Sequence, residues 1–293
     1  MIRLDTQLLR DPAPGWDAGL EIALARRGDC TRLVHARHWG PLRVQRPFYP
    51  TGTGPEGGEC HLYLLHPPGG MVTGDRLAID LALAEGARGL VTTPAAGKIY
   101  RGNASAVPQM QTVECRVSGD SCLEWLPQET ILFDGARGEL VTRVALDDGA
   151  RCAAWDIVCL GRPASGEGFT GGYLTQTLEL SRGGRPLYRE RNHFAGGGDL
   201  LASPWGLAGC TVAGSFLVTL GLDRDALGAL RGELSRRAAE RDRVAVSDLD
   251  GLVAIRYLGH SAERCRHLFS AAWRTLRPAL CGRDAIEPRI WRT

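Results

Sequence analysis

The amino-acid sequence predicts a mainly β fold with two α-helices near its C-terminus. Up to about residue 222, short apolar runs of strand length follow one another, and several of them alternate apolar with polar residues. Clusters of glycine and proline separate these runs, as turns do. Beyond residue 222 the apolar residues recur at helical spacing instead. We therefore expect a single domain over residues 1–293, β-rich over 15–222 and helix-containing over 223–293.

The β-rich part contains eight runs with the length and composition of strands. The clearest is 77–83, in which Leu77, Ile79 and Leu81 alternate with less apolar residues and predict a half-buried strand. Turn clusters such as 67–70 bound these runs. In chain order the expected strands are 20–25, 42–45, 61–65, 77–83, 87–93, 111–117, 123–125 and 140–146.

Two helices are expected in the C-terminal part, with a short strand between them. The first begins at Asp223, whose side chain suits an N-cap, and carries leucines at helical spacing. The second begins at Ser261 and is expected to end at Pro278, because proline has no amide hydrogen to donate. The expected spans are 223–241 and 261–278 for the helices and 252–257 for the strand.

Composition limits the compartment and the class of partner. Hydrophobic residues make up 44% of the chain and charged residues 23%, as in folded globular proteins. The net charge of +2 gives no electrostatic case for nucleic acid or membrane as a partner. Nine cysteines, an odd number with no CxxC pair, indicate reduced thiols, and residues 1–10 have no apolar signal core. We therefore expect a cytoplasmic protein.

Several enzyme motifs are approached in the sequence but fail in detail. Residues 52–57 match GxGxxG, yet a proline-rich segment precedes them where a dinucleotide loop needs a strand. Lys98 follows a glycine as in a phosphate loop, but Ile99 replaces the magnesium-binding Ser or Thr. Ser165 lies in a segment similar to the nucleophile-elbow pattern GxSxG, but Pro163 occupies the position of the first glycine. The sequence therefore assigns no catalytic residue, and a hydrolase using Ser165 or a cysteine is the weakest alternative.

Seven segments of unusual composition stand in a fixed order along the chain. They are GPLRVQRPFYP at 40–50, HPPGGMVTGD at 66–75, TTPAAGKIYR at 92–101, WLPQE at 125–129, WDIVCLGRP at 155–163, SGE at 165–167 and PRIW at 288–291. In this order they resemble the UreD family of urease accessory proteins, also called UreH, from about Gly15 to the last residue. Gly97, where Ser or Thr is common, and Met71, where a branched residue is usual, are mild departures from the family pattern.

The resemblance implies a fold, a role and partners. The family fold is a β-helix-like stack of strands with two helices. The family is a helper without known catalysis that associates with the accessory protein UreF and, through UreF, with the GTPase UreG. The assembly docks on apo-urease so that nickel reaches the urease active site. No tightly bound cofactor is implied, only nickel in transit, and a purely bridging scaffold that never contacts the metal stays open.

Four carboxylates are candidate ligands on such a nickel route, which needs weak and exchangeable oxygen or nitrogen ligands. Asp156 interrupts an apolar run, and a carboxylate in a buried strand costs several kcal/mol unless it is paired or bound to a cation. A salt bridge, for instance with Arg162, and an ion route are equally open for Asp156. Asp75, Glu167 and Glu190 are the other candidates, and Glu190, between two arginines, is most simply an ion-pair partner.

The direction of the Asp156 side chain follows from strand geometry. Successive side chains of a strand point to opposite faces, so Trp155 and Asp156 are expected on opposite sides. That arrangement is expected for a strand between a packed core and a polar interior passage.

Overall fold

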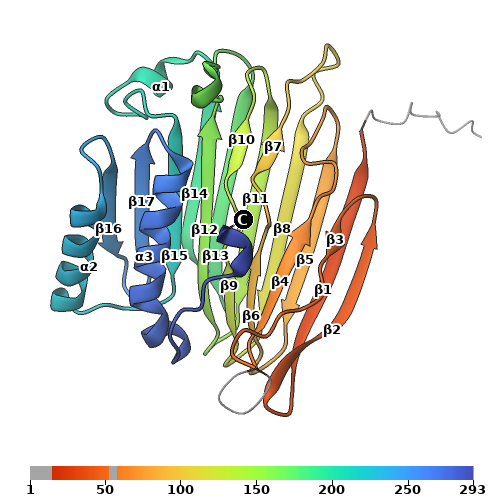
Figure 1. The fold of residues 1–293 in the computed structure, drawn as a ribbon, viewed down its shortest axis with the longest axis vertical. Helices are drawn as coiled ribbons and strands as arrows, with labels where there is room; N and C mark the ends of the chain where they lie inside the picture. Colours follow the sequence, from red (N-terminus) through yellow and green to blue (C-terminus); the bar gives the residue numbers. More distant parts are fainter. Residues whose placement is uncertain (1–14, 53–57, 293) are drawn as a thin grey trace, which may run out of the picture.

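Two β-sheets face each other, and helices cover the outer face of the second sheet (Figure 1). They are seen in a computed structural model that describes residues 15–52 and 58–292. The N-terminal residues 1–10 and most of the GxGxxG match at 52–57 lie outside the described residues. Within residues 15–52 and 58–292, the structure has no helix long and apolar enough to cross a membrane.

The first sheet has seven strands in the order β14-β13-β11-β8-β5-β1-β2. Its central strands are parallel, and an antiparallel hairpin partner closes each edge. Along the chain, these strands are β1 (Asp17–Arg27), β2 (Cys30–Trp39), β5 (Arg76–Leu83), β8 (Gln109–Val117), β11 (Arg137–Leu146), β13 (Tyr173–Arg182) and β14 (Arg185–Ala195).

The second sheet has the order β16-β17-β15-β12-β9-β6-β4-β3, with β7 and β10 joined at its side. The strands β4, β6, β9 and β12 are parallel, whereas β15, β16 and β17 continue the sheet in antiparallel fashion. Along the chain they are β3 (Arg43–Val44), β4 (Cys60–Leu65), β6 (Arg88–Thr92), β7 (Gly97–Ile99), β9 (Cys122–Trp125), β10 (Thr130–Leu132), β12 (Arg151–Leu160), β15 (Val212–Val218), β16 (Arg243–Asp248) and β17 (Val253–Gly259).

From β4 to β13 the chain passes back and forth between the two sheets, and each pass adds a parallel strand beside the previous one. The fold is therefore mainly β and β-helix-like, as expected. The helices are α1 (Asp199–Ala202), α2 (Arg224–Arg237) and α3 (Ala262–Cys281), with short 3-10 turns η1 (Pro163–Ser165) and η2 (Arg289–Arg292).

All eight strands expected up to residue 146 are confirmed, and so is the strand between the two late helices. Asp223 and Ser261 are the N-caps of α2 and α3, each accepting a backbone N–H with its side chain. The nine cysteines are free, and all but Cys159 are buried.

The expected end of the second helix at Pro278 is wrong. The helix α3 continues to Cys281 and ends at Gly282, whose φ of 70° is left-handed and whose N–H donates to the Pro278 carbonyl at 2.8 Å. Proline here removes one hydrogen bond in the last turn, while Leu280 and Cys281 stay buried. Burial of these side chains outweighs the lost hydrogen bond.

A second apolar core lies between α2, α3 and the outer face of the second sheet. Trp155 on β12 packs against Phe216 and Phe269, with ring centroids 5.4 and 6.1 Å away. Trp291 from η2 inserts beside them, 5.4 Å from the Trp155 ring, and its Nε1 donates to Thr92 Oγ1 at 2.9 Å. The C-terminal PRIW segment thus anchors the chain end on this core.

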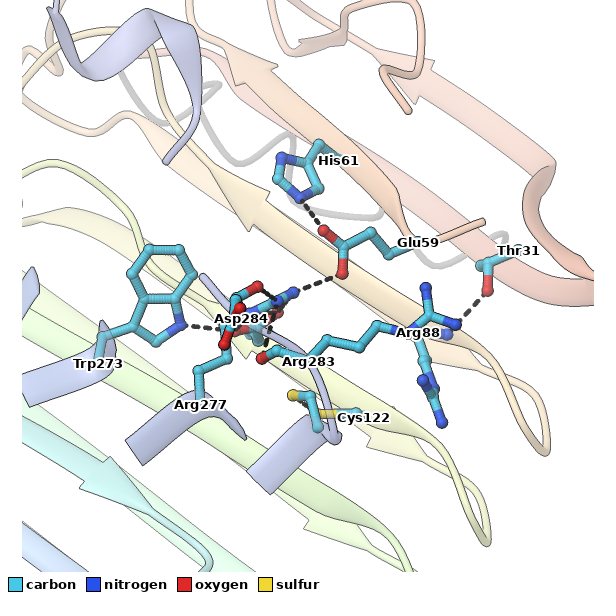
Figure 2. Close-up of polar contacts among 11 residues, drawn as sticks. Thr31, Glu59, His61, Arg88, Cys122, Trp273, Arg277, Arg283 and Asp284 are labelled. Carbon is cyan, nitrogen blue, oxygen red and sulfur yellow. Dashed lines mark hydrogen bonds and ion pairs between the residues drawn. The ribbon is translucent and has the colours of Figure 1, made fainter. Parts of the chain in front are cut away.

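A buried ion-pair network fastens α3 to the second sheet (Figure 2). Arg277 is 1% exposed and donates to Glu124 at 2.9 and 3.0 Å and to Glu59. Trp273 Nε1 donates to Glu124 at 2.6 Å, and His61 is 3.2 Å from Glu59. Burial alone would raise the pKa of Glu59, but the His61 hydrogen bond and the Arg277 charge outweigh it and lower this pKa to about 2.

Replacing Arg277 by alanine should destabilise the fold strongly, because it leaves Glu59 and Glu124 buried without their counter-charge. We expect the free energy of unfolding to fall by about 3–5 kcal/mol in urea titrations. Arg237→Ala, which removes an exposed pair with Glu233 within α2, is the control and should cost less than about 1 kcal/mol. Equal losses in the two variants would contradict a structural role for the buried network.

Candidate functional site

The four carboxylates singled out from the sequence lie in three separate places. Asp156 and Glu190 line one cleft between the two sheets. Asp75 lies in the turn before β5, and Glu167 lies just beyond η1. The structure therefore brings two of the four candidates together.

Asp75 holds two backbone segments against each other. Its side chain accepts the N–H of Trp16 at 2.7 Å with one oxygen and that of Val72 at 2.8 Å with the other. The residue is 5% exposed. Both oxygens thus satisfy backbone donors where the chain enters β1 and β5, which gives Asp75 a structural role.

Glu167 is the partner of Arg162, which donates to it from Nε at 2.8 Å and also from Nη2. Glu167 also accepts the N–H of Asp134 at 2.7 Å. The hydrogen bond from Arg162 is the main reason that the pKa of Glu167 is lowered. The proposed salt bridge between Arg162 and Asp156 is therefore wrong, because Arg162 pairs with Glu167 instead.

The cleft that holds Asp156 and Glu190 has a volume of about 520 Å³ and lies at the β14 end of the space between the sheets. On the second sheet, Asp156 of β12 pairs in register with Ser215 of β15, and Ser215 pairs with Arg256 of β17. These three residues thus form a row across the sheet. Glu190 comes from β14 of the first sheet, so the cleft joins the two sheets.

Glu190 is the centre of a hydrogen-bond network. The Ser215 hydroxyl lies 2.9 and 3.0 Å from its two oxygens, and Asn192 Nδ2 donates to it at 2.8 Å. The Tyr188 hydroxyl donates to Glu190 as well. The ion pair expected for Glu190 is present, but its partner is Arg256 of β17, with Nε 3.6 Å from Oε2.

Asp156 differs from Glu190 in having no cationic partner among the described residues. It is partly buried, and that burial raises its pKa from 3.8 to about 6. The charge of Glu190 acts in the same direction, while a hydrogen bond from Gln176 acts against it. The fold therefore disfavours the charged form of Asp156, and its ionisation at pH values above about 6 costs stability.

The expectation that Trp155 and Asp156 point to opposite sides is confirmed. Trp155 belongs to the core under α3, whereas Val158, on the same face as Asp156, belongs to the core between the sheets. The strand β12 therefore separates a packed aromatic core from a polar cleft.

The side chains of the cleft offer a metal ion oxygen ligands that bind weakly and exchange readily. Two carboxylates are accompanied by the Ser215 hydroxyl and by the side-chain amides of Gln176 and Asn192. Among the described residues there is no group of three or more His, Cys, Asp or Glu side chains that could hold a metal ion. The cleft can thus offer a divalent cation a few oxygen ligands but no closed cage.

Sequence reasoning missed five residues of this network: Gln176, Tyr188, Asn192, Ser215 and Arg256. A signal for one of them was present in the strand pattern. Gln176 stands between Leu174 and Leu178 on the inward face of β13, and it is 6% exposed although polar. A buried polar residue in an otherwise apolar row marks the position where the core between the sheets gives way to the cleft.

Ser165, the nucleophile of the hydrolase alternative, lies exposed in η1. In the described part of the chain, no histidine or carboxylate is hydrogen bonded to its hydroxyl, and the neighbouring Glu167 is engaged by Arg162. The nucleophile and base arrangement needed for this chemistry is thus lacking there.

The model of the UreD urease accessory protein family matches residues 17–292, which is nearly the whole chain. The protein belongs to this family. A urease accessory protein UreD from Saccharophagus degradans is 44% identical over 285 residues, 96% of this chain and 95% of the relative. One from Pseudomonas fluorescens Pf-5 is 46% identical over 280 residues, 96% of each chain. The UreD resemblance is therefore confirmed, and the protein is a urease accessory protein.

Replacing Asp156 by asparagine should stabilise this UreD-family protein above pH 6. The raised pKa means that Asp156 costs no stability below its unfolded pKa of 3.8, and that the cost develops as pH rises through about 6. A shift of this size corresponds to roughly 2–3 kcal/mol at pH 7.5. The free energy of unfolding of Asp156→Asn in urea titrations should therefore equal that of wild type at pH 4 and be larger than that of wild type at pH 7.5.

Asp242→Asn is the control, because the pKa of Asp242 is shifted in the opposite direction. Burial alone would raise the pKa of Asp242, but hydrogen bonds from Arg264 and from the Ala239 N–H outweigh it and lower the pKa. Its loss should destabilise the protein at pH 7.5. A destabilised Asp156→Asn at that pH would mean that Asp156 is part of a stabilising ion pair.

Proposed function

We propose that this protein is a scaffold for urease maturation that joins UreF and the GTPase UreG on apo-urease and passes nickel along the Asp156–Glu190 cleft. The observation that carries the proposal is Asp156, a charged group kept between two sheets without a cationic partner among the described residues. A bound cation would offset the cost of that charge. Nickel is cargo here, and the protein is not its final site.

The cleft suits a cation that must be released again. Carboxylate, amide and hydroxyl oxygens bind Ni²⁺ less tightly than thiolates do. The thiol of Cys159 does not face the cleft, because Cys159 shares with Ile157 the opposite face of β12. Glu190 and Asp156 belong to different sheets, so a cation between them would bridge the two layers. Ser215 is hydrogen bonded to Glu190 and next to Asp156, and holds the two carboxylates in this relation.

A bridging scaffold without metal contact is the second candidate, and one feature of the surface favours it. Trp205 is 95% exposed and Leu200 is 45% exposed at the rim of the cleft, in the segment that follows β14. Exposed tryptophan is a frequent anchor of protein interfaces. The same surface serves the first candidate, since a partner seated at the rim would cover the mouth of the cleft.

Removing the cleft carboxylates should reduce nickel transfer while the fold and partner binding stay intact. Asp156→Asn and Glu190→Gln keep the shape of each side chain and remove its charge, so fewer oxygen ligands remain for Ni²⁺. We expect each variant to bind Ni²⁺ more weakly in equilibrium dialysis and to leave less nickel in urease after co-expression with UreF and UreG, measured by atomic absorption.

Glu167→Gln is the matched control, because Glu167 is a carboxylate of the same chain that lies outside the cleft. It should leave nickel binding unchanged, although it releases Arg162. Full nickel content in urease with Asp156→Asn and Glu190→Gln, in complexes that still form, would favour the bridging scaffold.

Replacing Trp205 by serine should weaken complex formation. We expect wild type to be poorly soluble alone and to form a stable complex with UreF on a sizing column, and Trp205→Ser to raise the Kd by about tenfold or more, as at an interface anchor. Trp16→Ser is the control, since Trp16 is 56% exposed beside β1, at the far side of the first sheet. Equal affinities for wild type and Trp205→Ser would exclude the rim as the docking surface for UreF.

A further inference from the structure

We propose that Arg256 is an internal counter-ion that competes with the cargo cation for Glu190 and thereby keeps the affinity of the cleft low. The proposal rests on the function proposed above for the Asp156–Glu190 cleft. It assigns to one residue the task of making that site release its cargo, which the carboxylates alone do not explain.

The position of Arg256 places its charge next to one of the two carboxylates. Its Nε is 3.6 Å from Glu190 Oε2, and its Nη2 donates to the Tyr188 hydroxyl at 3.0 Å. Tyr188 in turn donates to Glu190. Asp156 has no such partner among the described residues, so the cleft contains one carboxylate with a counter-charge and one without.

The Arg256 side chain is held less firmly than that of Arg277, which pairs with two buried carboxylates. The side chain of Arg256 is 53% exposed and that of Glu190 is 19% exposed, whereas that of Arg277 is 1% exposed and is bound to Glu59 and Glu124. An exposed ion pair at 3.6 Å is worth little, while a buried and hydrogen-bonded pair is strongly held. Arg256 can therefore turn into solvent at small cost, and Arg277 cannot.

A divalent cation and a guanidinium compete for Glu190, because like charges close to each other repel. Binding of the cation at Glu190 is therefore strongest in molecules in which Arg256 has turned away. The apparent affinity is then the intrinsic affinity multiplied by the fraction of molecules in which Arg256 is displaced. The return of Arg256 also favours release, since it restores the counter-charge of Glu190 as the cation leaves.

The test compares Ni²⁺ binding by full-length variants at one pH and ionic strength. In equilibrium dialysis we expect Arg256→Gln to lower the Kd for Ni²⁺ roughly two- to fivefold, the range that loss of an exposed counter-ion allows. Nickel release to a competing chelator should slow by a similar factor. Arg256→Lys keeps the charge and should remain near wild type, and Arg256→Met should act like Arg256→Gln if glutamine itself disturbs the cleft.

Arg243→Gln is the matched control. Arg243 also lines the cleft and carries the same charge, but no contact joins it to Glu190 in the described structure. It should change the Kd less than twofold. If Arg243→Gln tightened binding as much as Arg256→Gln did, the effect would come from net charge and the role of Arg256 would be refuted.

The outcomes also separate this proposal from the proposed function. If Glu190→Gln weakens Ni²⁺ binding but Arg256→Gln binds no tighter than wild type, the nickel cleft stands and the competing role of Arg256 is wrong. If Ni²⁺ binding is insensitive to Glu190→Gln in both the wild-type and the Arg256→Gln background, both proposals are wrong. Tighter binding in Arg256→Gln that disappears in the double variant with Glu190→Gln supports both.

Discussion

The packing of the two sheets against each other is the constraint on which the site depends. Inward-facing side chains of β1, β5, β8 and β11 meet those of β4, β6, β9 and β12 in one continuous apolar core. At the β14 end the inward rows change from leucine and valine to Gln176, Asn192, Glu190, Asp156 and Ser215. Polar side chains of both sheets face each other there and line the cleft.

Two arginine–glutamate arrangements in the same chain illustrate how burial decides the role of a charge. Arg277 is enclosed with Glu59 and Glu124, and its hydrogen bonds fasten α3 to the second sheet. Arg256 stands at the mouth of a cleft and touches Glu190 only loosely. The first arrangement is structural because separating its charges would leave them unsolvated. The second is suited to exchange because water can replace the arginine.

The strands and helix starts were predictable because local chemistry determines them. A few neighbouring residues suffice to determine each of these features. They are the alternation over 77–83, the N-caps Asp223 and Ser261, and the opposite directions of Trp155 and Asp156. β2 was missed because most of its residues are exposed at the sheet edge, which removes the alternation that reveals a half-buried strand. The end of α3 was misplaced because burial of Leu280 and Cys281 outweighs the effect of Pro278.

The site was predictable only in part. Asp156 could be recognised as a carboxylate in an apolar strand, whereas its lack of a cationic partner within residues 15–52 and 58–292 depends on which arginines the fold brings near. Arg162 is six residues away and pairs with Glu167, while Arg256 is one hundred residues away and reaches Glu190. Asp75 and Glu167 were candidates because they stand in glycine-containing motifs, but backbone donors occupy Asp75 and Arg162 occupies Glu167. The surroundings of Asp156 and Glu190 depend on residues of other strands, so no single segment encodes their roles.

The central claim is that a cation passes between Asp156 and Glu190. Anomalous diffraction at the nickel absorption edge, from crystals of the full-length protein equilibrated with Ni²⁺, tests it most directly. We expect an anomalous peak within the cleft, coordinated by oxygen atoms of these two carboxylates, and no peak there for the Glu190→Gln protein. A peak at cysteine or histidine side chains away from the cleft, with the cleft empty at saturating nickel, would contradict the account.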